Sequence, residues 1–263
     1  MRIAVCMKQV PDISVKGSYD KKYTIDRNKG AFITNPADEI ALETALFIAE
    51  NVLAEISVFT MGSTRAEQLL KDACALGADK FYLISDPLFA GSDTYATSHI
   101  LSTALRKYGP FDCVLCGRRT LDGETGQVSG GISVMLDMPL VTNVVGIEAI
   151  KHDSIICSRF LEDRDEIIEV PLPSVMAVME GMSGITHPRL PSILGLRKAL
   201  SVPIELLNCK SLELTENEVG LTGSYTKVKN TFFPDWSRKC VFFSDVYDGV
   251  SQIIELIKKT NDI

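Results

Sequence analysis

The sequence has few of the features that binding to nucleic acids, metals or membranes requires. Its net charge is −7, from 27 basic and 34 acidic residues, whereas a protein that binds duplex nucleic acid needs a basic surface. Its three histidines are scattered, and none has a second histidine at metal-ligand spacing. No apolar run approaches the roughly 20 residues of a membrane span. We therefore expect no nucleic-acid binding, no metal site and no membrane insertion.

Signals for secretion and disulfide bonding are also absent. MRIAVCMKQV leads directly into a short strand, without the apolar region and cleavage site of a signal peptide. The seven cysteines are an odd number, and most lie in apolar runs, as Cys6, Cys113, Cys157 and Cys240 do. This pattern indicates reduced, buried thiols in a cytoplasmic protein. Cys113 and Cys116 have CxxC spacing inside an apolar strand rather than at a helix N-terminus, so we expect no redox or metal role for them.

The first 140 residues alternate strand and helix patterns. RIAVCM, EISVFTM, KFYLIS and FDCVLC are strand-like, and each is followed by a helical pattern. We therefore predict an α/β fold of the Rossmann-like type, with a parallel sheet that is covered by helices on both faces. In such a sheet, ligands bind beyond the carboxyl ends of the strands.

After Pro139 the pattern changes to β-rich runs with short polar turns. LVTNVVGIEAI, SIICSRFLE, EIIEVPLP and SVMAVME predict a largely antiparallel extension or closing edge of the sheet. Residues 206–263 show no core of their own, but 246–259 form an amphipathic helical pattern. Phe232, Phe233 and Trp236 favour docking on a partner chain, although packing onto the same domain fits the composition equally well. We divide the chain into an α/β domain, 1–205, and an extended C-terminal arm, 206–263.

The run FDCVLC ends in GRRTLDGETGQV, residues 117–128, before the next helix. Glycines let backbone N–H groups approach phosphate, and a helix N-terminus adds partial positive charge. The stretch matches neither GxxxxGK[ST] nor GxGxxG. On its own it fits a plain turn as well as a phosphate site.

Two further loops favour the phosphate site. Asn35, Pro36, Ala37 and Asp38 open a helix, with Asn as the cap and Pro at the first helical position. Met61 ends the second predicted strand. Because the carboxyl ends of parallel strands line one crevice, the loops after the first, second and fourth strands can meet over one nucleotide.

Five blocks of the sequence resemble the β (small) subunit of electron transfer flavoproteins. They are AVCMKQVPD, TNPADEIALETAL, ACALGADKFYLI, CGRRTLDGETGQVSG and HPRLPSILGLRKALSVPIE, in order from residue 1 to about 205. The resemblance implies a heterodimer with an α subunit that carries most of the contacts to one FAD. It implies that the β chain holds an adenine nucleotide, AMP in ordinary members and a second FAD in electron-bifurcating ones. Chemistry would belong to the flavin, so no catalytic side chain is expected.

Carried over by motif, the cofactor-binding residues are Cys6, Asn35, Pro36, Ala37, Asp38, Met61, Gly117, Arg118, Arg119, Thr120, Leu121, Asp122, Gly123, Glu124, Thr125, Gly126, Gln127 and Val128. The ordinary loop reads roughly D-D-D-x-N-Q-T and the bifurcating loop D-G-D-T-A-Q-V. This chain has D-G-E-T-G-Q-V, which is closer to the second. Gly123 removes the bulk and negative charge of an acidic side chain, so we favour FAD, with AMP as the alternative.

The resemblance also implies that residues 181–203, here named the recognition segment, dock on a flavin-dependent dehydrogenase such as an acyl-CoA dehydrogenase. The expected partner-binding residues are Arg189, Leu190, Ile193, Arg197 and Lys198. Ile193 replaces the family's anchoring leucine and the lysine-rich run is reduced, which suggests a dedicated dehydrogenase. Two alternatives lie outside the family: an adenine-nucleotide hydrolase or ligase, for which no SGGxDS-like loop is present, and a stand-alone sensor of the universal-stress type, for which the aromatic tail would be superfluous.

Overall fold

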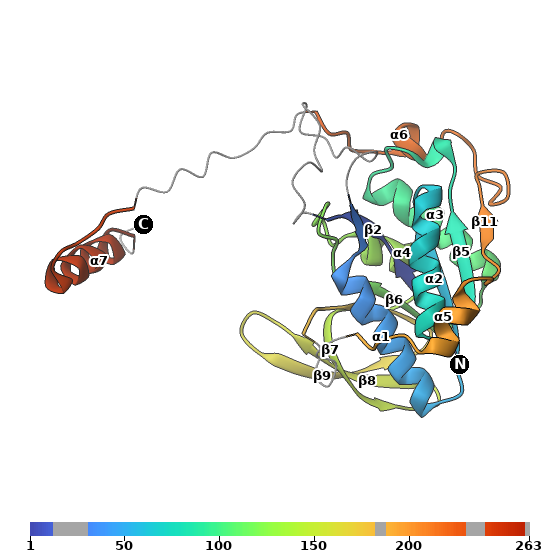
Figure 1. Ribbon diagram of the computed structural model, residues 1–263, viewed down its shortest axis with the longest axis horizontal. Coiled ribbons are helices and arrows are strands. Elements are labelled where there is room, and N and C mark those ends of the chain that lie inside the picture. Colours follow the sequence, from blue (N-terminus) through green and yellow to red (C-terminus); the bar gives the residue numbers. More distant parts are fainter. Residues whose placement is uncertain (13–30, 182–187, 230–239, 261–263) are drawn as a thin grey trace. The chain divides into compact units, whose positions relative to one another are not determined.

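The computed structural model describes residues 1–12, 31–181, 188–229 and 240–260. The chain divides into two compact units, Met1–Lys229 and Asn230–Ile263. The first unit is built on a nine-stranded sheet with the order β11-β5-β4-β1-β6-β10-β7-β8-β9 (Figure 1). Its strands are β1 (Arg2–Met7), β4 (Glu55–Met61), β5 (Lys80–Ile84), β6 (Cys113–Gly117), β7 (Leu140–Ile150), β8 (Ser154–Phe160), β9 (Asp165–Pro171), β10 (Ser174–Val178) and β11 (Glu205–Leu207).

Helices connect most of the parallel strands. They are α1 (Pro36–Asn51), α2 (Glu67–Leu76), α3 (Thr94–Tyr108), α4 (Val128–Leu136) and α5 (Ile193–Ala199), with single 3₁₀ turns η1 (Thr64–Ala66) and η2 (Pro87–Phe89); the short α6 (Gly220–Gly223) follows β11. A separate ribbon pairs β2 (Gln9–Pro11) with β3 (Phe32–Thr34). Gly77 ends α2 with a positive φ of 124° and donates its N–H to the carbonyl groups of Ala73 and Cys74, as a glycine C-cap does.

The predicted α/β fold is confirmed. The strands from β11 to β7 run parallel, while β8 and β9 continue the sheet antiparallel. The antiparallel extension is therefore limited to these two strands. SVMAV forms β10, which lies inside the sheet and pairs parallel with both β6 and β7. Its five residues are all buried, as a central strand with both faces covered requires.

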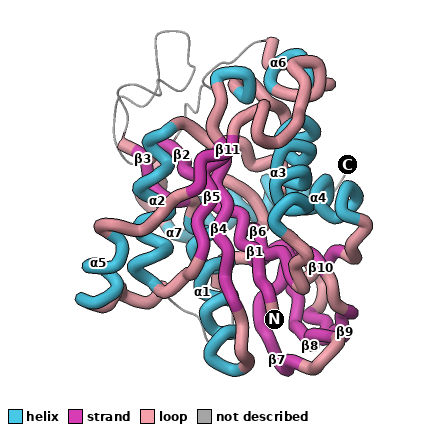
Figure 2. The backbone as a smooth tube through the Cα atoms, turned by 90° about the vertical axis from the view of Figure 1, so that its right-hand side faces the viewer, coloured by secondary structure: helices cyan, strands magenta, loops and turns pink. Residues whose placement is uncertain are grey.

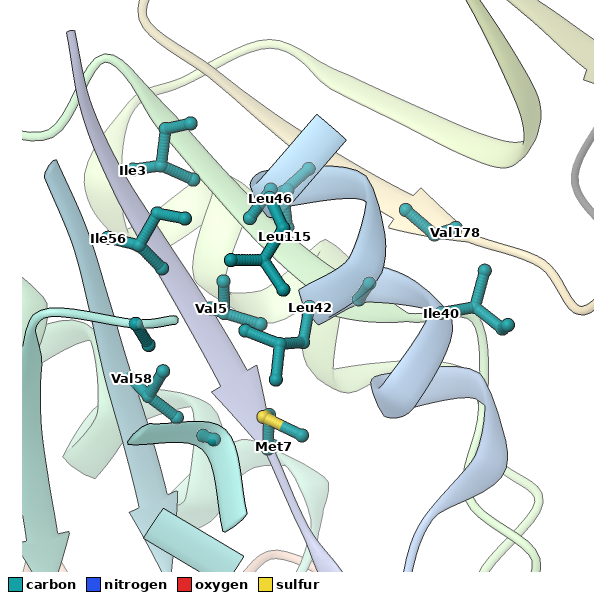
Figure 3. Packing of buried hydrophobic residues seen from close by; sticks show 14 of the residues in the cluster. Ile3, Val5, Met7, Ile40, Leu42, Leu46, Ile56, Val58, Leu115 and Val178 are labelled. Carbon is teal, nitrogen blue, oxygen red and sulfur yellow. The ribbon is translucent and has the colours of Figure 1, made fainter. Parts of the chain in front are cut away.

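Two hydrophobic clusters cover the two faces of the sheet. Side chains of β1 alternate between them: Ile3, Val5 and Met7 pack with α1 and α2, whereas Ala4 and Cys6 pack with α3 and α4. Figure 2 shows α1, α2 and α5 on one side of the strands and α3 and α4 on the other. The close contact of α1 with β1, β4 and β6 is seen in Figure 3. This packing fixes the start of α1 over the ends of β1 and β6.

The cysteines are free thiols, as predicted, and six of them are buried. Cys240 is exposed, so the prediction of a core position was wrong for this residue. Cys113 and Cys116 belong to opposite faces of the sheet, because they are three residues apart on one strand. This CxxC pair therefore cannot form a single thiol site. Within the described residues there is no group of ligands that could hold a metal ion.

The first unit extends through Lys229, beyond the boundary at 205 expected from the sequence. The reason is that β11 pairs with β5 at the edge of the sheet. In addition, Leu207, Leu212 and Val219 are buried in the hydrophobic cluster on the face that α3 and α4 cover. The amphipathic pattern near the C-terminus forms α7 (Val246–Thr260), in the second unit. Phe232, Phe233 and Trp236 lie outside the described residues. Over the described ranges, no helix has the length and apolar character needed to cross a bilayer.

Candidate functional site

The site begins at the carboxyl ends of β1 and β6, the neighbouring strands between which the strand order reverses. From β1 the chain continues to β4 and β5 on one side, and β6 lies on the other. Such a reversal opens a crevice at the carboxyl ends of the strands. Two buried side chains of the α1 start, Asn35 and Asp38, contact the segments that follow these strand ends. The sequence therefore correctly places the first helix opening beside the end of β6.

Asn35 holds the loop after β6 instead of capping its own helix. Its side chain makes no cap hydrogen bond to α1. Instead, Nδ2 donates to the carbonyl of Arg119 at 2.9 Å, and Oδ1 accepts from the N–H of Leu121 at 3.1 Å. Pro36 at the first helical position removes one N–H that would otherwise need a partner. The amide is thus free to bind two backbone groups of residues 117–128, here named the cradle loop.

Asp38 joins the ends of β1 and β6. Its carboxylate accepts the N–H of Lys8 at 2.7 Å and the N–H of Gly117 at 3.0 Å. Burial raises the pKa of Asp38 to about 7, although the hydrogen bonds from Lys8, Asn35 and Gly117 oppose this shift. A buried carboxyl group therefore sets the backbone position at the floor of the crevice.

Gly117 is required by this close packing. A Cβ atom at this position would lie 2.3 Å from Oδ1 of Asp38 and 2.8 Å from the carbonyl carbon of Ala37. No side chain fits there without moving α1 away from β6. The glycine that ends the strand therefore serves the contact between two backbone segments, in addition to any close approach of a ligand.

A third connection joins the cradle loop to β1. Lys8 Nζ lies 2.8 Å and 2.7 Å from the two carboxylate oxygens of Asp122. Burial alone would raise the pKa of Asp122, but the hydrogen bonds and charge of Lys8 outweigh it and hold the pKa below its ordinary value. Asp122 is therefore ionised at neutral pH and paired, rather than available as a general acid.

Beyond Asp122 the loop turns sharply into α4. Glu124 and Gly126 have positive φ values of 49° and 62°. Across the turn, Nη1 of Arg119 lies 3.6 Å from Oε1 of Glu124. No side chain caps α4, in contrast to α3 and α5, which are capped by Asp93 and Ser192. The N-terminal N–H groups of α4 are thus without the side-chain acceptor that the other two helices have.

A cavity of about 260 Å³ opens at this turn. It is lined by Arg118, Arg119, Glu124, Thr125, Gly126, Ser129, Thr142, Asn143 and Ala177. Two guanidinium groups, several hydroxyl and amide groups and a helix N-terminus suit a phosphate-containing ligand. The residues present therefore fit a phosphate-containing ligand.

Not every predicted cofactor residue contacts this cavity. Cys6 pairs with Cys116 across β1 and β6 and is buried below the crevice. Met61 ends β4, one strand further from β6. Thr120, Leu121 and Gly123 belong to the turn, and Gln127 and Val128 start α4. Asn35, Ala37 and Asp38 support the cradle loop from below, because they are buried.

Three residues near this site were not predicted from the sequence: Lys8, Thr142 and Asn143. Lys8 directly follows β1, so its position at a carboxyl strand end was readable from the sequence. Asn143 adopts a positive φ of 58° within β7. It was missed because it belongs to a run that was expected at the antiparallel edge, whereas β7 lies next to β10 in the parallel part.

The described part of the recognition segment, 188–203, packs on α1 and α2. Arg189 donates to Glu43 Oε1 at 2.8 Å and to Glu50 Oε1 at 2.7 Å. A Cβ at Gly195 would lie 2.1 Å from the carbonyl oxygen of Ala75, so α5 lies directly against α2. Arg197 and Lys198 are in the last turn of α5, where the helix dipole favours cations.

Large apolar side chains of this segment are exposed. The exposed fractions are 91% for Leu190, 86% for Ile193, 78% for Leu194 and 83% for Leu200. Of the predicted partner residues, Leu190 and Ile193 therefore face solvent, whereas Arg189 is engaged with α1.

The comparisons with known proteins all indicate the same family. Residues 23–208 match the model of the electron transfer flavoprotein domain. An electron transfer flavoprotein subunit beta from Thermoanaerobacterium thermosaccharolyticum is 40% identical over 265 residues, covering 100% of both chains. CarD, of the caffeyl-CoA reductase-Etf complex from Acetobacterium woodii, is 40% identical over 89% of this chain and 88% of its own. The acryloyl-CoA reductase electron transfer subunit gamma from Anaerotignum propionicum is 37% identical over 89% of each chain. With its α/β fold and its cradle loop, the chain belongs to the electron transfer flavoprotein family, as a β subunit.

Proposed function

We propose that this chain is the β subunit of a heterodimeric electron transfer flavoprotein and that its cradle loop holds FAD. The observation that carries the proposal is the polar cavity lined by the cradle loop, the first residues of β7 and Ala177 of β10. When bound, a flavin supplies hydride and single-electron chemistry. The chain supplies binding and orientation.

The ligand's phosphates are proposed to lie at the uncapped N-terminus of α4. Arg118 and Arg119 line this part of the cavity and offset phosphate charge. Asn35 and Asp38 do not touch the ligand in this proposal. They hold the backbone of the cradle loop in place.

Two features favour FAD over AMP. The cradle loop has Gly123 where an acidic residue would add bulk and negative charge, and a Cβ at this position would have Thr120 Oγ1 as its nearest neighbour, at 3.4 Å. The cavity also continues past the loop to Thr142, Asn143 and Ala177. AMP alone, with a structural role, is the alternative. In that case, occupation of the crevice would stabilise the fold by mass action.

We further propose an α subunit as the permanent partner and the second unit, 230–263, as part of the surface that contacts it. The transient partner is proposed to be a flavin-dependent dehydrogenase or reductase of acyl-CoA thioesters, because two relatives carry reductases of such thioesters in their names. Exposed Leu190 and Ile193 would fill apolar pockets of that partner. The buried free thiols agree with the cytoplasmic location expected from the sequence. Family membership argues against the hydrolase and stand-alone sensor alternatives.

The choice of nucleotide is tested by Gly123→Asp. The full-length chain, co-purified with its α subunit and stripped of nucleotide, is titrated with FAD and with AMP. We expect the variant to keep its affinity for AMP and to bind FAD about tenfold more weakly or worse, since the new carboxylate adds bulk and negative charge to the cradle loop. Equal loss of both ligands, or loss of neither, would count against the assignment of FAD.

A further inference from the structure

Lys8 stands at the junction of all three segments that form the crevice. Its backbone N–H donates to Asp38 of α1 at 2.7 Å, and its carbonyl accepts from the N–H of Asn35 at 2.9 Å. The Cα of Lys8 is therefore fixed on both sides. Its side chain starts from a defined point and reaches across to the cradle loop.

The contact at the other end is equally defined. Both carboxylate oxygens of Asp122 accept from Nζ, at 2.8 Å and 2.7 Å. The Asp122 side chain is only 12% exposed, whereas that of Lys8 is 42% exposed. Charge-assisted hydrogen bonds of this geometry are stronger than neutral ones. Removal of the cation also costs more free energy when the carboxylate is partly buried than when it is exposed, because the buried group cannot be fully hydrated.

The Lys8–Asp122 ion pair lies further along the cradle loop than the contacts made by Asn35 and Asp38. Asn35 and Asp38 bind backbone groups of residues 117–121, the first half of the cradle loop. Among the described residues, Lys8 makes the last connection from the N-terminal segment before the left-handed turn at Glu124 and Gly126. That turn delivers the first residues of α4 to the cavity.

We propose that Lys8 is a positioning residue for the nucleotide: through Asp122 it fixes the second half of the cradle loop, and so sets the place of the α4 N-terminus against the phosphates. Lys8 does not itself bind the ligand. This inference rests on the proposed nucleotide-binding function.

A double-mutant cycle tests the inference. Lys8→Met, Asp122→Asn and the double variant are made in the full-length chain, purified with the α subunit and stripped of nucleotide. Equilibrium dialysis with AMP and with FAD gives the dissociation constants, and denaturant unfolding without ligand gives the stability. Lys151→Met is the matched control, because Lys151 Nζ also lies 2.8 Å from a carboxylate, that of Glu169 on β9, but Lys151 is in the turn between β7 and β8, away from the cradle loop.

Each single variant is expected to weaken AMP binding by about tenfold, with the double variant no weaker than either single one. Lys8→Arg, which can still bind Asp122, should recover binding to within about threefold of the wild type. Lys151→Met should bind like the wild type. If Lys8→Met does not fold, Asp122→Asn breaks the same pair and leaves Lys8 in place.

Three outcomes would overturn the inference. Unchanged binding by Lys8→Met and Asp122→Asn would mean that the pair does not position the loop. Weaker binding by Lys8→Met together with unchanged or tighter binding by Asp122→Asn would mean that the ammonium binds phosphate directly. Absence of binding by the wild-type complex would remove the proposed function as well, so the two failures are distinguishable.

Discussion

The segments that follow β6 and β10 leave neighbouring strands of one sheet, yet they are held in different ways. After β6, the cradle loop is bound by the buried side chains of Asn35 and Asp38, which contact its backbone directly. After β10, the recognition segment is held by partly exposed ion pairs of Arg189 with α1 and by the packing of α5 on α2, and it leaves Ile193 in solvent. The loop that we propose to present backbone groups to a small ligand is thus fixed by buried side chains. The segment that we propose to present apolar side chains to another protein is held through its polar and small residues, which leaves the large apolar side chains exposed.

Asp38 gives the largest expected effect. Its pKa is about 7 in the folded chain against an ordinary value of 3.8, so the folded state keeps a proton that the unfolded state releases between these values. The contribution of Asp38 to the free energy of unfolding is therefore fully present below about pH 4. It falls as the pH rises toward 7, by up to about 4 kcal/mol. Urea unfolding of the wild type and of Asp38→Asn at pH 4 to 7 measures the difference. Parallel stability curves would show that Asp38 does not titrate in this range.

Gly117→Ala should destabilise the first unit by roughly 3 kcal/mol, because the added Cβ overlaps backbone and buried carboxylate atoms that cannot move independently. Gly123→Ala is the matched variant in the same loop, where the nearest neighbour is the hydroxyl of Thr120 at 3.4 Å. Its stability should stay within about 0.5 kcal/mol of the wild type. Chemical denaturation of both variants gives the comparison, and equal effects would contradict the special role of Gly117.

Arg189→Met should lower the free energy of unfolding by about 1–2 kcal/mol, since it leaves the largely buried carboxylate of Glu43 without its cation. Arg164→Met serves as the control, because Arg164 pairs with Asp163 and Glu166 at an exposed hairpin turn. We expect its effect on the free energy of unfolding to be below about 0.5 kcal/mol. Similar losses for the two variants would show that the recognition segment is not held through α1.

Ile193→Ser should leave stability unchanged and act on docking alone. With the side chain 86% exposed, its loss should raise the KM of the partner dehydrogenase for this protein about tenfold at unchanged kcat. Leu53→Ser replaces another apolar residue, 95% exposed, outside the recognition segment, and should have no effect. A similar KM for Ile193→Ser and the wild type would remove Ile193 from the docking surface.

Local sequence patterns predicted the helices and strands well where a pattern is compatible with only one secondary structure. The strand and helix runs from Arg2 to Leu136 were predictable because apolar runs, Pro36 and Gly77 each favour one structure at their positions. The central place of β10 was not predictable, since SVMAV can pair with any strand and its position depends on the chain's path through β7 to β9. The roles of Asn35 and Asp38 were hidden for a related reason. Asn at a helix start is fully explained by capping, and only the structure reveals that its partners lie 84 and 86 residues away.

The number and kind of nucleotides bound by the wild-type complex decide between FAD and AMP in the cradle loop. The full-length chain is purified with its α subunit and denatured, and the released nucleotides are separated and counted against protein. We expect two FAD and no AMP for each heterodimer, with the second FAD held by the cradle loop. One FAD together with one AMP would contradict the assignment of FAD to this site, and one FAD with no second nucleotide would contradict a nucleotide site in the cradle loop altogether.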